Sequence, residues 1–179
     1  MYSFRNDYSE GAHPKVLQAL ADTNLRQTVG YGMDPCCQAA ADTIRRLCAA
    51  PDAAVHFLVG GTQVNLVTID AFLQSYEAVV AAQTGHVSTH ETGAIEATGH
   101  KVCTVESPDG KLTPALVESV LAGHNGTEHM VLPRMVYISD TTEIGTVYTR
   151  AELAALRQCC DVHGLFLYLD RSEERRVGK

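Results

Sequence analysis

The stretch "TRAELAALRQCCDVHGLFLYLD" (149–170) decides the fold class. Its first part has apolar residues at helical spacing, with Thr149 placed to cap the helix and Gly164 placed to end it. The apolar run "LFLYLD" that follows is typical of a buried strand ending in an acid. A helix that leads directly into a buried strand is the repeating step of a parallel sheet covered by helices.

The same alternation continues through the upstream sequence. Strands are expected at 54–59, 77–82, 100–106 and within 129–139, and helices at 13–24, 35–50, 62–74, 90–99 and 113–121. This pattern predicts an α/β fold in three α/β/α layers, with a mostly parallel sheet and helices on both of its faces. We expect one domain over residues 1–170, because no repeat and no low-complexity linker interrupts them.

Composition excludes several classes of partner. The formal net charge of −7 disfavours nucleic acid and anionic lipid, which bind to basic patches. No apolar run is long enough to span a membrane, and the first residues do not resemble a secretory signal, so we expect a cytoplasmic protein. The six cysteines match no zinc-ribbon spacing and are expected to be reduced and buried.

Candidate site residues follow the expected strands, because ligands of parallel sheets gather at the carboxyl ends of the strands. In "FLVGGTQVN", Gly61 and Thr62 lie where a helix begins, and its free N–H groups suit a phosphate. The alternative is that these residues form only a tight turn between strand and helix, with Thr62 as a capping residue. Asp170 ends the last strand, where a carboxylate can hold a cationic ring nitrogen or serve only as a loop acid.

Histidines are dense in "TGHVSTHETGAIEATGHKV" (84–102). His86 and His90 are four residues apart, which on a helix suits a metal, but Gly93 weakens a continuous helix and the metal motif H-E-x-x-H is absent. We therefore predict no metal here. The alternative is that His86 stacks on an aromatic cofactor, while His90 and His100 are structural.

The N-terminal loops contain polar residues that are unusual in plain linkers. Asn6 lies in "FRNDYSEGAHP", and Tyr31 lies in "GYGMDP". Loops of this composition often reach into a site, although a surface arm with turn chemistry explains them equally well.

Taken in order, the motifs resemble the threonine aldolase / β-eliminating lyase family of pyridoxal-phosphate enzymes, and its low-specificity L-threonine aldolase branch most closely. The similarity runs from Phe4 to Asp170 through "FRNDYSEGAHP", "GYGMDP", "GGTQVN", "TGHVSTHETGAIEATGHKV", "DGKLTP", "TTEIGTVY" and "LYLD". The resemblance implies the large domain of the aspartate-aminotransferase-like fold (fold type I). It also implies pyridoxal 5'-phosphate as cofactor, a homodimer or homotetramer, and cleavage of β-hydroxy-α-amino acids such as threonine to glycine and an aldehyde.

The resemblance also implies residue roles. Gly61 and Thr62 match the family's phosphate-binding turn, and His86 matches the histidine that stacks on the pyridine ring and assists proton chemistry. Asp170 matches the acid that pairs with the ring nitrogen, so His86 and Asp170 are the expected catalytic residues.

Substrate contacts are implied less directly. Tyr31 lies in a loop that in the family reaches the active site, and Asn6 stands where relatives often have a serine that holds the substrate carboxylate. Glu143 stands in a loop where many relatives have a histidine, which is a departure from the family pattern.

No lysine matches the family's Schiff-base lysine, which comes on a later strand beyond the acid. Residues 171–179, "RSEERRVGK", are densely charged and resemble a translated sequencing adapter, so we expect a non-native tail. Two hypotheses remain open. The chain is a truncated N-terminal fragment of a pyridoxal-phosphate lyase that is inactive alone, of aldolase or another β-eliminating type, or it is a non-catalytic homologue that acts by binding.

Overall fold

The computed structural model describes residues 11–124 and 126–171 in two compact units, 1–58 and 59–179, which are described separately below. Asn6 and the expected tail at 172–179 lie outside the described residues. The single domain expected over residues 1–170 stays a prediction. Within the described part, none of the helices combines the length and the apolar character needed to cross a bilayer.

Residues 11–58, the described part of the first unit, contain two helices close to their predicted positions, α1 (Pro14–Thr23) and α2 (Pro35–Leu47). Each helix begins at a proline, whose missing N–H costs nothing in the first turn. The side chain of Asp34 accepts hydrogen bonds from the backbone N–H groups of Cys36 and Cys37 and so caps α2.

The strand predicted at 54–59 is wrong. Residues 54–59 have no strand conformation, and Phe57 and Val59 are exposed, at 46% and 96%. The physical reason is that a strand needs a neighbour for its backbone hydrogen bonds, and in the described part of the chain all four strands pair among themselves elsewhere. Apolar composition alone does not supply that neighbour.

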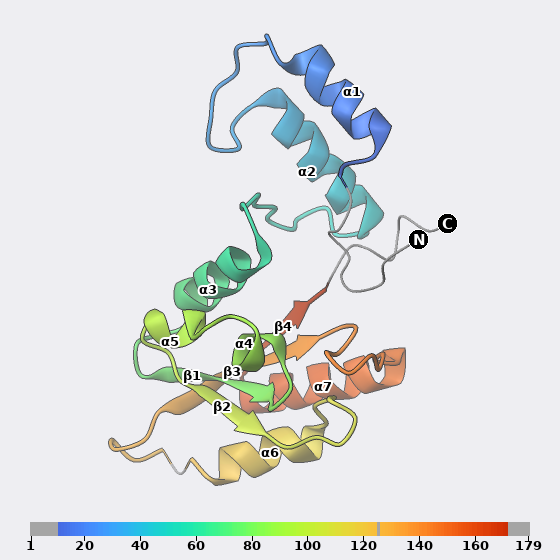
Figure 1. Ribbon diagram of the computed structural model, residues 1–179. Coiled ribbons are helices and arrows are strands. Elements are labelled where there is room, and N and C mark those ends of the chain that lie inside the picture. The colour runs from blue at the N-terminus through green and yellow to red at the C-terminus, as the bar shows by residue number, and fades with distance from the viewer. Residues whose placement is uncertain (1–10, 125, 172–179) are drawn as a thin grey trace. The chain divides into compact units, whose positions relative to one another are not determined.

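The second unit alternates helices and strands as the sequence predicts (Figure 1). Its strands are β1 (Glu77–Ala82), β2 (Val102–Val105), β3 (Leu132–Ser139) and β4 (Phe166–Asp170). Its helices are α3 (Gly61–Phe72), α4 (His86–Thr89), α5 (Ala94–Ala97), α6 (Pro114–Ala122) and α7 (Arg150–His163). The helix expected at 90–99 is shorter than predicted, because only α5 forms within that range and Gly93, in a left-handed conformation, immediately precedes it. The short helix α4 lies before the predicted range.

The sheet is parallel throughout, in the order β2-β1-β3-β4. Alternate side chains of its strands enter two separate cores. Val80, Val136 and Ile138 pack with residues of α6 and α7 on one face. Val79 and Tyr137 pack with residues of α3, α4 and α5 on the other face. The predicted three-layer α/β/α arrangement is therefore confirmed in this unit.

The stretch 149–170 folds as its letters predict. The Thr149 side chain accepts a hydrogen bond from the N–H of Glu152, whose own side chain accepts from the N–H of Thr149, which completes a capping box. Gly164 ends α7 with φ +65°, a left-handed conformation that favours glycine. β4 then pairs with β3, so Asp170 lies opposite Ser139 at the carboxyl edge.

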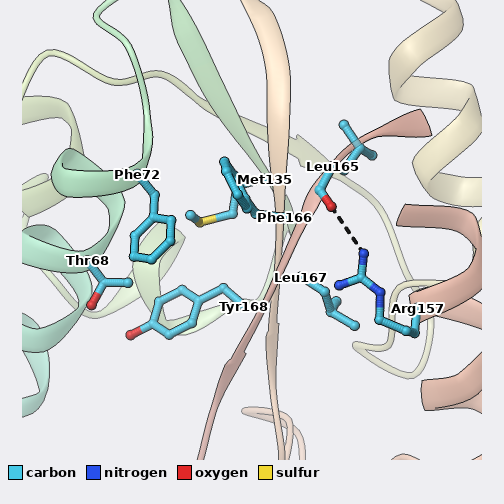
Figure 2. A pocket seen from close by; sticks show the side chains of 8 residues that line it. All are labelled: Thr68, Phe72, Met135, Arg157, Leu165, Phe166, Leu167 and Tyr168. Atoms are coloured by element: carbon cyan, nitrogen blue, oxygen red, sulfur yellow. Dashed lines mark hydrogen bonds between the residues drawn. The ribbon is translucent and has the colours of Figure 1, made fainter. Parts of the chain in front are cut away.

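An open groove of about 440 Å³ runs beside β4, which pairs with β3 and with no other strand among the described residues (Figure 2). Its lining is mainly apolar and includes Phe72, Met135 and Phe166. Arg157, on α7, also lines the groove and donates a hydrogen bond to the carbonyl oxygen of Leu165. The groove therefore follows the sheet edge that β4 forms in the described part of the chain.

All six cysteines are free thiols, as predicted, but only half of them are buried. Cys103, Cys159 and Cys160 lie in the second unit and are buried. The others belong to the first unit and are exposed or half-buried, so the prediction of burial is wrong for them: Cys36, Cys37 and Cys48.

Candidate active site

Two of the predicted site residues meet at the carboxyl edge of the sheet. His86 begins α4 just after β1, and Asp170 ends β4. One ligand atom each of His86, Asp170 and a third residue, Glu91, lie within 4.8 Å of one another. Because parallel strands end at the same edge, residues far apart in sequence converge there.

A buried asparagine joins these groups. Asn65, on α3, donates from Nδ2 to Glu91 Oε1 at 2.5 Å and to Asp170 Oδ2 at 3.1 Å. Its Oδ1 accepts a hydrogen bond of 2.6 Å from the Tyr168 hydroxyl. Asn65 is 2% exposed, and these bonds use both of its amide hydrogens and its oxygen, so the orientation of the amide is fixed.

The surrounding hydroxyls keep their protons. The Tyr137 hydroxyl donates to Asp170 Oδ2, and burial, reinforced by the Asp170 charge, raises the pKa of Tyr137 far above its ordinary value. The same causes, burial first, raise the pKa of Tyr168 to about 12. Both phenols therefore remain neutral donors at physiological pH.

Glu91 orients the histidine. Its Oε1 lies 2.6 Å from His86 Nδ1, and because a carboxylate only accepts, Nδ1 donates and Nε2 is left for other partners. The Glu91 side chain is fully buried, and its second oxygen, Oε2, has no hydrogen-bond partner among the described residues. A buried, half-paired carboxylate attracts a cationic or hydrogen-bond-donating ligand.

Gly61 and Thr62 form the first turn of α3, where no side chain caps the free N–H groups. No atom lies within 4 Å of a Cβ placed on Gly60 or Gly61, so bare backbone faces open space there. Asn65 follows Thr62 by three residues and therefore lies on the same face of α3. The helix start and the carboxylate cluster thus share one side of this helix.

Other predicted residues have different surroundings. His100 is buried, its Nδ1 donates to the carbonyl oxygen of Glu77 at 3.1 Å, and its Nε2 lies 3.5 Å from Asp70, which confirms a structural role. The His90 ring centroid lies 5.5 Å from that of His86, and its Nε2 lies 3.8 Å from Glu143. His90 is therefore close to the cluster, but it is not part of the hydrogen-bonded network.

Tyr31 lies in the first unit, in the turn before α2, and is fully exposed with φ +64°. Its role in substrate binding, like that of Asn6, stays a prediction. The prediction that the site holds no metal also stays a prediction, because His86, Glu91 and Asp170 are of types that bind metals. The hydrogen bonds that already join these three side chains explain their convergence without an ion.

Sequence reasoning missed Asn65, Glu91, Tyr137 and Tyr168 as site residues. The pairing register of β3 and β4 places Tyr137 opposite Tyr168, with ring centroids 5.5 Å apart. Glu91 and Asn65 lie inside quoted motifs, but their contacts span 26 and 105 residues of sequence. The spacing of Asn65 after Thr62 was the one local signal that both belong to the same helix face.

Comparisons with known proteins fit this geometry. The sequence profile described as "Beta-eliminating lyase" matches residues 4–172. A low specificity L-threonine aldolase from a Pseudomonas species (strain NCIMB 10558) is 36% identical over 169 residues, which are 93% of this chain and 48% of that protein. The chain therefore spans about half the length of the curated relatives it matches.

Solved structures agree on the fold. A threonine aldolase structure from Leishmania major is 55% identical with a TM-score of 0.92, covering 94% of this chain and 49% of that one. A putative kynurenine aminotransferase from Saccharomyces cerevisiae, Bna3p, has a TM-score of 0.69 at 17% identity, covering 92% of this chain and 42% of that one, and so shows the fold alone. The fold is that of the aspartate-aminotransferase-like (fold type I) large domain, of which this chain matches part.

Proposed function

The chain belongs to the β-eliminating lyase family, and from that premise we propose that the full-length protein is a pyridoxal-phosphate-dependent aldolase. Its substrates would be β-hydroxy-α-amino acids such as threonine, cleaved to glycine and an aldehyde. The observation that carries the proposal is the convergence of His86 and Asp170 at one sheet edge, around a buried carboxylate with an unpartnered oxygen.

The donors and charges of the cluster fit this cofactor. When bound, pyridoxal phosphate supplies a ring that accepts the electrons of the breaking Cα–Cβ bond. Asp170 would hold the proton on the ring nitrogen, because a carboxylate favours the charged form of a nearby base. Tyr137 and Asn65 both donate to Asp170 Oδ2 and so fix the position of that carboxylate.

His86 would lie against the ring and handle protons near the substrate hydroxyl. Glu91 holds its Nδ1, so the Nε2 atom is the one available to take or return a proton. The phosphate would bind where α3 begins, at the backbone N–H groups of Gly61 and Thr62. The hydroxyl of Thr62 is a further donor there.

We place the remaining parts of the site by the resemblance alone. Asn6 and Tyr31 would contact the substrate, and residues 1–170 would form part of the cofactor-binding large domain. The full-length protein would act in the cytoplasm as a homodimer or homotetramer. The Schiff-base lysine would come from residues that this chain does not include.

The test uses the full-length protein and L-threonine, with glycine and acetaldehyde measured as products. Asp170→Asn should lower kcat/KM by at least about 100-fold, the scale of losing one placed electrostatic partner. Asp161→Asn, an exposed acid on α7, is the matched control and should leave activity unchanged. Full activity in Asp170→Asn, or no aldehyde from the unaltered protein, would refute the proposal.

A spectroscopic test uses this chain alone. The full-length protein should show a visible absorption band that borohydride bleaches, whereas this chain should show none, because none of its lysines matches the family's Schiff-base lysine. A borohydride-reducible band on the purified chain would contradict that assignment. If the full-length protein binds the cofactor but releases no aldehyde, another β-eliminating reaction or a binding role replaces the aldolase.

A further inference from the structure

A second group of metal-ligating side chains lies between α6 and α7, which cover the sheet face opposite to α3 (Figure 1). Glu118 comes from α6, and Cys159 and His163 come from α7. One ligand atom of each lies within 4.8 Å of the other two. None of the three residues belongs to the candidate active site.

The spacing suits a single ion. Cys159 and His163 are four residues apart on α7, so their side chains share one face of the helix. Glu118 Oε1 lies 3.7 Å from His163 Nε2. A tetrahedral zinc ion places neighbouring ligand atoms about 3.3–3.8 Å apart, given metal–ligand bonds of about 2.0–2.3 Å.

The remaining adjustment is small. The side chains of Glu118 and His163 are 58% and 36% exposed, so both can move by about 1 Å, one bond length or less, without disturbing the core. Cys159 is buried beneath the protein surface, at 7% exposure, and supplies a fixed point. The arrangement is one anchored thiol facing two adjustable ligands.

The local electrostatics favour a cation. α7 ends at His163, and the last carbonyl groups of a helix carry partial negative charge. Glu118 adds a full negative charge. The nearest basic side chain along α7, Arg157, already pairs with Asp161 at 2.7 Å.

We propose that Glu118, Cys159 and His163 bind one zinc-like divalent cation, with water as fourth ligand, and that the ion links α6 to α7. Bonds form from Cys159 Sγ, an imidazole nitrogen of His163 and a carboxylate oxygen of Glu118. The thiol proton leaves to solvent as the metal–sulfur bond forms, and no electron is transferred. Sulfur and imidazole ligands select zinc or cobalt over magnesium or calcium.

Cobalt(II) is the probe, because thiolate coordination gives a near-ultraviolet charge-transfer band that oxygen ligands do not give. The starting chain carries Cys36→Ser, Cys37→Ser and Cys48→Ser, which removes the exposed and half-buried thiols of the first unit. Titration with Co²⁺ should produce the band, and Zn²⁺ should abolish it by displacing the cobalt. Zn²⁺ should also raise the unfolding temperature, because the ion joins two helices of the folded state.

Three substitutions locate the site. Cys159→Ser should remove the band. His163→Gln and Glu118→Gln change exposed residues that folding tolerates, and each should weaken Co²⁺ binding by more than about 10-fold, since even outer-shell partners of metal ligands contribute 10–100-fold. Asp161→Asn removes a neighbouring carboxylate outside the group and should leave the affinity unchanged.

The proposal fails if the starting chain gives no charge-transfer band, or if the band survives Cys159→Ser. It also fails if both His163→Gln and Glu118→Gln bind Co²⁺ as tightly as the starting chain. Cys103→Ser and Cys160→Ser test the two other thiols that the starting chain keeps, of which Cys103 Sγ lies 3.6 Å from His124 Nε2. If the band is lost in Cys103→Ser or Cys160→Ser but survives Cys159→Ser, another thiol binds the metal and the proposal is refuted.

Discussion

Replacing Asn65 by alanine should destabilise the second unit by about 3 kcal/mol. The substitution removes two hydrogen bonds to carboxylates, Glu91 and Asp170, and one from the Tyr168 hydroxyl. A net value of about 1 kcal/mol for each bond gives this total, because every bond leaves a buried or half-buried partner behind. His86 and Tyr137 still hold the two carboxylates, so the loss stays below the full cost of an isolated buried charge.

Urea unfolding followed by circular dichroism measures this loss, at constant m-value. Asn24→Ala is the matched control, because Asn24 is exposed at the end of α1, and it should change stability by no more than about 0.5 kcal/mol. A double-mutant cycle of Asn65→Ala with Tyr168→Phe should give a coupling energy of about 1 kcal/mol. A loss below about 1 kcal/mol for Asn65→Ala, with no coupling to Tyr168, would refute the network.

Four further changes test other parts of the fold. Gly110→Ala should cost about 1–3 kcal/mol, since Gly110 has φ +72° and a Cβ there would lie 3.2–3.3 Å from neighbouring atoms; unchanged unfolding would contradict that crowding. Thr149→Ala should cost about 1 kcal/mol by removing the cap of α7, measured by the same unfolding, and an unaffected midpoint would show that the capping box is unimportant. The hydrogen bond from Lys111 is the main cause that lowers the pKa of Glu152 to about 2. The ionised Glu152 therefore stabilises the folded state above pH 4.5, and this stabilisation is lost as the pH falls through 2. Glu152→Gln should remove this acid dependence from the unfolding midpoint, and an identical pH profile would show that the pair does not contribute. Leu169→Lys, at an exposed position of β4, should reduce self-association measured by ultracentrifugation, because charge on an open sheet edge opposes pairing, and unchanged association would exclude that edge.

Elements with local signals could be predicted from the sequence. The boundaries of α7 and β4 follow from Thr149, Gly164 and a short apolar run, all within 22 residues of chain. Residues 54–59 (AVHFLV) are as rich in apolar residues as β4 (FLYLD) but form no strand. The difference is non-local, because β4 has β3 beside it and residues 54–59 have no paired strand among the described residues. Apolar composition favours a strand, but the segment forms one only where a neighbouring strand pairs with it.

Some residues of the candidate site could likewise be predicted from the sequence, whereas others depend on contacts between distant segments. Asp170 and His86 could be predicted because parallel strands end at one edge, so the position of a residue after a strand indicates its place in the fold. Asn65 could not, since its role depends on contacts across 26 and 105 residues. Glu91 follows His90 in the sequence and resembles a surface acid, but in the structure it is 2% exposed and contacts Asn65 of α3 and His86 of α4.

The charge balance of the cluster limits what it can bind. Its neutral donors, Asn65 and the phenols of Tyr137 and Tyr168, orient the carboxylates of Glu91 and Asp170 but cancel none of their charge. The raised pKa values of both phenols keep these donors neutral across the physiological range. Among the described side chains no lysine or arginine pairs with either carboxylate. We therefore expect an anionic or neutral ring to bind here less well than a protonated pyridine nitrogen. The positive start of α3, the same helix that carries Asn65, is where we propose that the phosphate of such a ligand binds.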